Sequence, residues 1–141
     1  MKYVLDSSAA LSALLPEPLS AKAIRLRDDY RRAVHDLIAP DIFPAELFNA
    51  LLKAERTKRI LVGDAVILYT SSGSDVPVLH PYLPLLGRAG DISSRYRVAL
   101  YDCLYLALAE RESCEMVTGD SKFVNVLQVH FPQIIHLSSM P

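Results

Sequence analysis

Four acidic residues stand at positions from which their carboxylates could act together: Asp6, Glu46, Asp102 and Asp120. Asp6 and Asp120 each follow a short apolar run, and Glu46 opens an amphipathic segment. Asp102 is the only residue between Ala99 and Ala109 that is neither apolar nor aromatic. Burying a lone carboxylate costs free energy, so a buried Asp102 would need an interaction partner or a function that explains it.

Carboxylates brought together repel one another, by about 4 kcal/mol for a pair roughly 4 Å apart at an effective dielectric constant near 20. A bound divalent cation is the usual means by which proteins offset this repulsion. A ligand set of carboxylates without His or Cys suits Mg²⁺, with Mn²⁺ as a possible substitute, far better than Zn²⁺. Such an ion polarises phosphoryl oxygens and activates water, which is the chemistry of phosphodiester hydrolysis.

Each acid also has a simpler explanation. Asp6 and Asp120 stand where aspartate commonly caps a helix, and Glu46 interacts favourably with a helix dipole. Asp102 could cap a helix that begins at Cys103, although "DCLY" lacks the Glu or Gln that completes a capping box. For each acid taken singly, the simpler explanation is favoured over a role in a cation site. For the four acids together, the simpler explanations leave their expected common location at one sheet edge as a coincidence.

The chain between these acids alternates strand-like and helix-like segments. Strands are predicted at 2–6, 37–40, 76–80, 115–120 and 133–137, and helices at 7–16, 19–36, 43–59, 62–72, 99–110 and 121–128, with an irregular helical segment at 82–96 interrupted by Pro84, Gly87 and Gly90. This alternation predicts an α/β sandwich around a mostly parallel sheet, formed as one domain over residues 1–141. Ligands of such folds bind outside the carboxyl ends of the strands, where the acids are expected.

Bulk composition narrows the class of protein. The 141 residues are 51% hydrophobic and 22% charged, with a net charge of −1, which indicates an ordered chain without a global basic signature. No apolar run approaches the roughly 18 residues of a membrane-spanning helix, so a soluble protein is expected. The two cysteines, Cys103 and Cys114, have neither metal-ligand spacing nor disulfide density, which favours a reducing, cytoplasmic location.

The ordered acids resemble the motifs of PIN-domain ribonucleases, and most closely those of VapC-type toxins. The matching segments are "YVLDSSAAL" with Asp6 and Ser8, "PAELFNAL" with Glu46, "YRVALYDCLYLALAE" with Asp102, and "MVTGDSKF" with Thr118 and Asp120. The resemblance implies a PIN-like α/β/α sandwich and a Mg²⁺-dependent endoribonuclease. In it, Asp6, Glu46, Asp102 and Asp120 would hold one or two ions, water would attack phosphorus in line, and Ser8 or Thr118 would support the carboxylates.

The resemblance also implies partners: an RNA substrate, a second copy of the chain in a homodimer, and, for toxins, a cognate antitoxin. Other PIN-domain nucleases process or degrade RNA without an antitoxin, and the compact length favours the toxin branch. A receiver-like Mg²⁺-binding signalling domain would need paired acids after the first strand, and an aspartyl phosphatase would need D-x-D, whereas "LDSS" has one acid. A non-catalytic binding module would not need the complete acid set.

RNA binding beside acidic residues requires local positive charge. Arg95, Arg97 and Lys122 adjoin the acids in sequence and are the predicted phosphate contacts. The cations of segment 19–36 are interrupted by Asp28 and Asp29 and are interpreted as a solvated helix face. Asn49, one helical turn after Glu46, either orients that carboxylate or is an exposed polar residue.

Overall fold

A five-stranded sheet forms the centre of the computed structural model, which describes all 141 residues. The spatial order is β3-β2-β1-β4-β5, and every neighbouring pair is parallel, so the predicted α/β fold with a mostly parallel sheet is confirmed. The strands are β1 (Lys2–Leu5), β2 (Asp36–Pro40), β3 (Val78–His80), β4 (Glu115–Thr118) and β5 (Ile134–His136). Strands β1, β2 and β4 are almost wholly buried, whereas β3 is an exposed edge strand.

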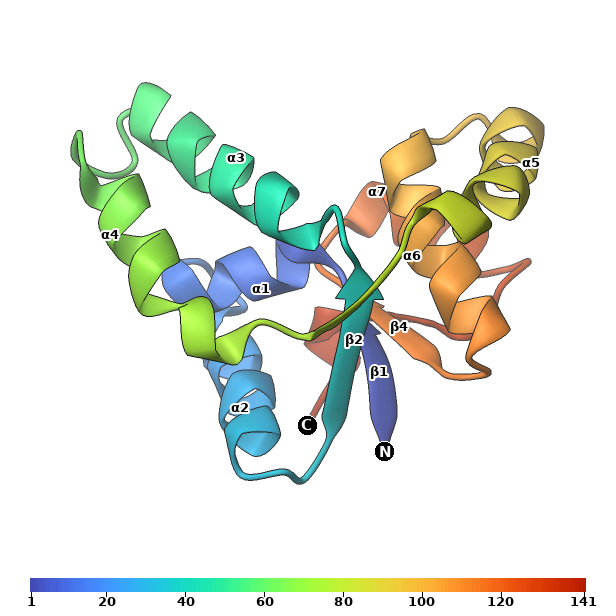
Figure 1. The fold of residues 1–141 in the computed structure, drawn as a ribbon, viewed down its shortest axis with the longest axis horizontal. Helices are drawn as coiled ribbons and strands as arrows, with labels where there is room; N and C mark the ends of the chain where they lie inside the picture. Colours follow the sequence, from blue (N-terminus) through green and yellow to red (C-terminus); the bar gives the residue numbers. More distant parts are fainter.

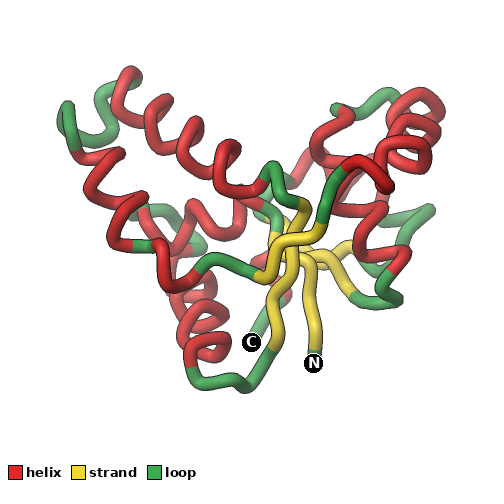
Figure 2. Tube along the Cα trace, in the orientation of Figure 1, coloured by secondary structure: helices red, strands yellow, loops and turns green.

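Seven helices surround this sheet, as the ribbon and the tube show (Figures 1 and 2). They are α1 (Ser7–Leu14), α2 (Ser20–Arg31), α3 (Phe43–Arg56), α4 (Asp64–Ser71), α5 (Leu86–Tyr96), α6 (Leu100–Arg111) and α7 (Ser121–Leu127). Short 3₁₀ turns occur at Gly73–Asp75, Leu83–Leu85 and Leu137–Ser139. Helices α1 to α4 gather on one side of the sheet and α5 and α6 on the other, so the helices form two arms that diverge from the strands (Figure 1).

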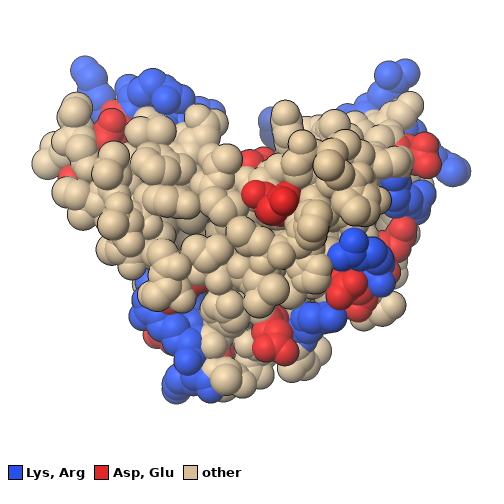
Figure 3. Space-filling model, in the orientation of Figure 1, with Lys and Arg blue, Asp and Glu red and all other residues tan.

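The strand order reverses beside β1. The chain first proceeds outward from β1 through β2 to β3, then returns to β4 on the other side of β1 and continues to β5. Because parallel crossovers are right-handed, this reversal sends the later helices to the opposite face. A crevice therefore opens at the carboxyl ends of β1 and β4, which is where ligands bind in open α/β sheets. The space-filling view shows a notch between the two arms, with acidic atoms visible at its base (Figure 3).

Helix α6 anchors one arm in the core. Every residue from Cys103 to Ala109 is buried, as expected for a helix that is apolar all round, and α6 packs against β1, β2 and β4. Because α6 leads directly into β4, it runs opposite to the strands, and its first turn lies at their carboxyl edge. The burial of α6 thus fixes the position of Asp102.

Two predicted elements differ from the structure. The helix expected at 19–36 ends at Arg31, because Ala33 adopts a left-handed conformation (φ 57°) and Asp36 N pairs with Met1 O to begin β2. The segment expected to be interrupted by Gly87 and Gly90 is instead continuous through both glycines. Packing of Ala89 and Ile92 in the core outweighs the low helix propensity of glycine there.

Candidate active site

The four acids occupy the carboxyl edge of three adjacent strands, β2, β1 and β4. Asp6 follows β1, and its backbone N–H donates to Val117 O of β4 at 3.0 Å. Asp120 follows β4 by two residues. Glu46 lies in the first turn of α3, which follows β2, and Asp102 lies in the first turn of α6. The order of strands therefore brings together the residues that the sequence singled out.

Asp6 is the most buried of the acids, with 3% of its surface exposed. Its Oδ2 accepts hydrogen bonds from Ser8 Oγ at 2.6 Å and Thr118 Oγ1 at 2.7 Å. Burial raises the pKa of Asp6, the two hydroxyl donors lower it, and the charge of Asp120 raises it further; the net direction is upward. Both hydroxyls donate to the same oxygen, which leaves Oδ1 without a side-chain partner.

Ser8 and Thr118 also join the two turns that carry Asp6 and Asp120. Their hydroxyl oxygens lie 3.2 Å apart, Gly119 N donates to Ser8 Oγ at 2.9 Å, and Asp120 N donates to Thr118 Oγ1 at 3.1 Å. Backbone and side-chain groups of both turns are thus satisfied by each other, as buried polar groups require. The predicted supporting residues lie next to the carboxylates that they were expected to support.

Asp102 has no hydrogen-bond partner in the protein, and it does not cap its helix. Helix α6 begins at Leu100 and its N-cap is Ala99, so the alternative in which a helix begins at Cys103 is wrong. Burial raises the pKa of Asp102 to about 7, and the negative charges of Asp6, Asp120 and Glu46 contribute in that order. The apolar sequence around Asp102 therefore produces a half-buried carboxyl group that titrates near neutral pH.

Asp120 does cap a helix. It is the N-cap of α7, and its Oδ1 accepts from Phe123 N at 3.1 Å. The capping explanation for this residue is confirmed, yet Oδ2 makes no hydrogen bond. One carboxylate oxygen is held by the backbone of α7, and the other has no hydrogen-bond partner.

Glu46 is held by a residue that the sequence analysis missed. Tyr105 Oη donates to Glu46 Oε1 at 2.6 Å, whereas Asn49, the residue predicted to orient Glu46, is exposed and makes no side-chain hydrogen bond. Burial raises the pKa of Glu46, the Tyr105 hydroxyl lowers it, and the Asp6 charge raises it; the net shift is upward. The sequence "LYLALA" gave no sign of this contact because Tyr105 matches the apolar pattern of a core helix.

The chemistry of the donor set fits a hard divalent cation, because the side chains facing the crevice offer only oxygen. As the side chains stand, no three His, Cys, Asp or Glu residues lie close enough together to share one ion. The carboxylates nonetheless perturb one another's pKa values, so they lie within electrostatic reach.

The predicted phosphate contacts are exposed. Arg97 ends α5 in a left-handed conformation (φ 59°), Lys122 lies in the first turn of α7, and neither has an ion-pair partner. The guanidinium of Arg95 lies over the Tyr96 ring, 5.7 Å from its centroid. All three side chains are exposed, and none of them forms an ion pair with an acid.

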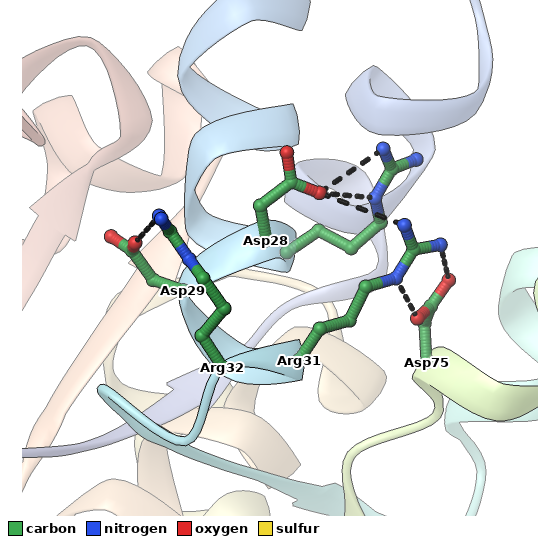
Figure 4. Close-up of polar contacts among 6 residues, drawn as sticks. Asp28, Asp29, Arg31, Arg32 and Asp75 are labelled. Atoms are coloured by element: carbon green, nitrogen blue, oxygen red, sulfur yellow. Dashed lines mark hydrogen bonds and ion pairs between the residues drawn. The ribbon is translucent and has the colours of Figure 1, made fainter.

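Three arginines in and just after α2 differ from these cations, because each of them is paired with an acid (Figure 4). Arg31 forms a two-pronged pair with Asp75 (2.6 Å for each contact), and Arg32 lies 2.7 Å from Asp29. Arg27 contacts Asp28 at 3.4 Å. These pairs support the interpretation of the end of α2 as a solvated helix face.

A parallel sheet with this reversal of strand order, followed by acids at its carboxyl edge, is the arrangement that the resemblance to PIN-domain ribonucleases implies. The PIN domain family model matches residues 3–127, and the chain belongs to that family. Among curated proteins it is similar to Ribonuclease VapC9 of Mycobacterium tuberculosis, with 27% identity over 129 residues that cover 92% of this chain and 94% of the relative.

Two solved structures share the fold. One is a protein from Pyrobaculum aerophilum, with a TM-score of 0.69 and 21% identity, covering 99% of this chain and 94% of the other. The second is VapBC2 from Rickettsia felis bound to a DNA fragment from their promoter, with a TM-score of 0.64 and 15% identity, covering 96% and 97% of the two chains. Separately, none of the helices combines the length and the apolar character that crossing a membrane requires.

Proposed function

We propose that this protein is a metal-dependent endoribonuclease and the toxin of a toxin–antitoxin pair. The observation that carries the proposal is the gathering of four acids, from four separate elements, at the carboxyl edge of β2, β1 and β4. Membership of the PIN domain family and similarity to a curated VapC ribonuclease over most of both chains support the same activity.

Asp6, Glu46, Asp102 and Asp120 would hold the cation, which we propose to be Mg²⁺, with Mn²⁺ able to replace it. The bound ion would polarise the phosphoryl group and lower the pKa of the attacking water. Ser8 and Thr118 keep Asp6 Oδ2 occupied, so that Oδ1 is directed to the ligand. Asp102 must lose its proton to bind the ion, and its raised pKa makes that step sensitive to pH near 7.

RNA would approach the crevice along its unneutralised cations. The acids repel a polyanion, so Arg95, Arg97 and Lys122 would attract and align the phosphates on either side of the scissile bond. The exposure of all three side chains supports this role. The paired cations of α2 are not part of the proposed RNA surface.

The proposed biological setting is a single-domain protein of the cytoplasm that forms a homodimer and is silenced by an antitoxin. The likeness to VapBC2 supports the antitoxin partner, because that structure is of VapBC2 bound to a DNA fragment from their promoter.

Cleavage assays test the activity. Purified protein is incubated with structured and unstructured RNAs, with Mg²⁺ or with EDTA, beside D6A and D102N. We expect cleavage that EDTA abolishes and that each substitution reduces at least about 100-fold, in line with losses on removing catalytic groups. Products should carry 5′-phosphate and 3′-hydroxyl ends. Cleavage that survives chelation and both substitutions, or 2′,3′-cyclic phosphate ends, would contradict metal-activated water.

A growth assay tests the toxin role separately. Induced expression of the wild-type chain should arrest growth, D102N should not, and co-expression of the product of a neighbouring short gene should restore growth. A chain that cleaves RNA in vitro but leaves growth unchanged would favour RNA processing or decay without an antitoxin.

A further inference from the structure

One hydrogen bond joins helices α3 and α6, which belong to different arms of the molecule. Tyr105 lies on α6 and Glu46 on α3, and their contact of 2.6 Å is the only hydrogen bond between these two helices. Figure 1 shows the helices diverging on opposite sides of the sheet. The hydroxyl of Tyr105 on α6 thus contacts Glu46 on α3, which is one of the proposed cation-binding residues.

The environment of Tyr105 makes it a fixed donor. Its residue surface is 0% exposed, in a helix whose other buried residues are Leu, Ala and Cys. A tyrosine hydroxyl inside such a core requires a partner, and it donates to Glu46 at 2.6 Å, with the Ser7 side chain also within its reach. Burial raises the pKa of Tyr105, so the phenol stays protonated and donates at any physiological pH.

The contact constrains Glu46 while leaving it able to bind. Oε1 accepts from Tyr105, and Oε2 has no hydrogen-bond partner in the protein. The same division occurs at Asp6, where both hydroxyl donors occupy Oδ2. Tyr105 also lies three residues after Asp102, which places both on one face of α6. One turn of this rigid helix therefore carries one acid and the group that orients another.

We propose that Tyr105 is a positioning residue that orients the Glu46 carboxylate and thereby sets the cation affinity and turnover of the site. The inference rests on the proposed function for its catalytic readout, but not for its binding readout. Hydrogen-bond partners of metal-binding carboxylates typically contribute 10- to 100-fold to metal affinity or activity. A phenylalanine at position 105 keeps the ring that fills the core and removes only the hydroxyl.

The test compares Y105F with Y30F. Tyr30 is a suitable control because its hydroxyl also donates a hydrogen bond, which is partly buried, to Val76 O at 3.1 Å, and none of the four proposed ligands is its partner. Mn²⁺ binding without RNA is measured by calorimetry, and kcat and KM are measured at saturating Mg²⁺. We expect Y105F to weaken Mn²⁺ binding about tenfold and to lower kcat with KM for RNA unchanged. Y30F should match the wild type in all three.

A double-mutant cycle with E46Q separates a positioning effect of Tyr105 from a general loss of stability. In the double-mutant cycle with E46Q, adding Y105F should have no further effect on Mn²⁺ affinity, because the carboxylate through which Tyr105 acts is already gone. Additive effects, or a Y105F protein that binds Mn²⁺ and turns over like the wild type while melting at a lower temperature, would overturn the proposal. If the wild type binds Mn²⁺ but cleaves no RNA, the ribonuclease assignment fails and the binding comparison still decides the role of Tyr105. Absence of Mn²⁺ binding by the wild type would overturn both.

Discussion

Thr118 donates a 2.7 Å hydrogen bond to Asp6 across the boundary between β4 and β1, although 112 residues separate them in sequence. The same Thr118 oxygen accepts from Asp120 N at 3.1 Å. The fully buried Thr118 thus makes hydrogen bonds to the side chain of Asp6 and to the backbone of Asp120, which are two of the proposed cation-binding residues. The crevice is organised by hydroxyl groups that never need to touch the substrate.

Replacing Thr118 with valine tests this organisation. The valine has the same shape but leaves Asp6 with one hydroxyl donor fewer and Asp120 N without an acceptor, so we expect unfolding free energy to fall by about 1–3 kcal/mol. Urea unfolding measures the change. T118S is the matched control, because it loses a methyl group and keeps the hydroxyl. Mg²⁺ should stabilise T118S and wild type similarly and T118V less; equal stabilisation of all three would show that the hydroxyl does not prepare Asp6.

The stability of the metal-free protein should fall as pH rises. Asp102 has an ordinary pKa of 3.8 when unfolded and about 7 when folded, so the folded state binds more protons between these values. Unfolding free energy therefore decreases from about pH 4 to pH 7 and then levels off for this group. The raised pKa values of Asp6 and Glu46 act in the same direction.

D102N isolates that contribution. Without metal, we expect the variant to melt about 2–4 °C above the wild type at pH 8, with the difference shrinking towards pH 4, where the wild-type carboxyl is protonated. Melting curves in EDTA across this range measure it. A D102N protein that is less stable than the wild type at pH 8 would mean that the Asp102 charge is stabilised by contacts of its own.

Cation binding should release a proton from Asp102. Below its pKa of about 7, Mg²⁺ or Mn²⁺ has to displace that proton, so the affinity should fall up to about tenfold for each pH unit between 7 and 5. Calorimetry in buffers of different ionisation enthalpy reports both the affinity and the number of protons released. In D102N the affinity should be weaker and its pH dependence shallower. An affinity that is constant from pH 5 to 8 would contradict a role for Asp102 as a ligand.

RNA binding should depend on the unneutralised cations and not on those of α2. Each of R97Q and K122Q is expected to weaken binding to single-stranded RNA and to reduce the slope of log K against log salt by about 0.7. R32Q is the control, since Arg32 is paired with Asp29 at 2.7 Å. Titrations at several salt concentrations, in the D102N background to prevent cleavage, give both quantities. An equal loss in R32Q would indicate a diffuse electrostatic effect.

The acids could be found from the sequence because their positions follow from topology. A strand that ends in Asp, repeated in a parallel sheet, places carboxylates at one edge, and this holds for Asp6 and Asp120. Helix boundaries were harder where propensity and packing conflict: α5 continues through Gly87 and Gly90, and α2 ends at an alanine turn without a glycine to signal it.

The hydrogen-bond partners were less predictable than the ligands. Ser8 and Thr118 lie beside Asp6 and Asp120 in sequence, so proximity indicated them. Tyr105 is 59 residues from Glu46, and its apolar neighbours match any buried helix. Tertiary packing decides which residue contacts a carboxylate from a distant part of the sequence. The local spacing that indicated Asn49 carries no information about such contacts.

The pairing of β1 with β4 affects the order in which the proposed site is assembled during synthesis and folding. Tyr3 is opposite Glu115 and Leu5 is opposite Val117. The strand that precedes Asp6 is therefore synthesised more than 100 residues before the strand with which it pairs. Contacts of such long range form late in folding. In every partly synthesised or partly folded chain that lacks β4, Asp6 has neither Thr118 nor Asp120 beside it. The proposed cation site is therefore incomplete until most of the chain has been synthesised and β4 has paired with β1.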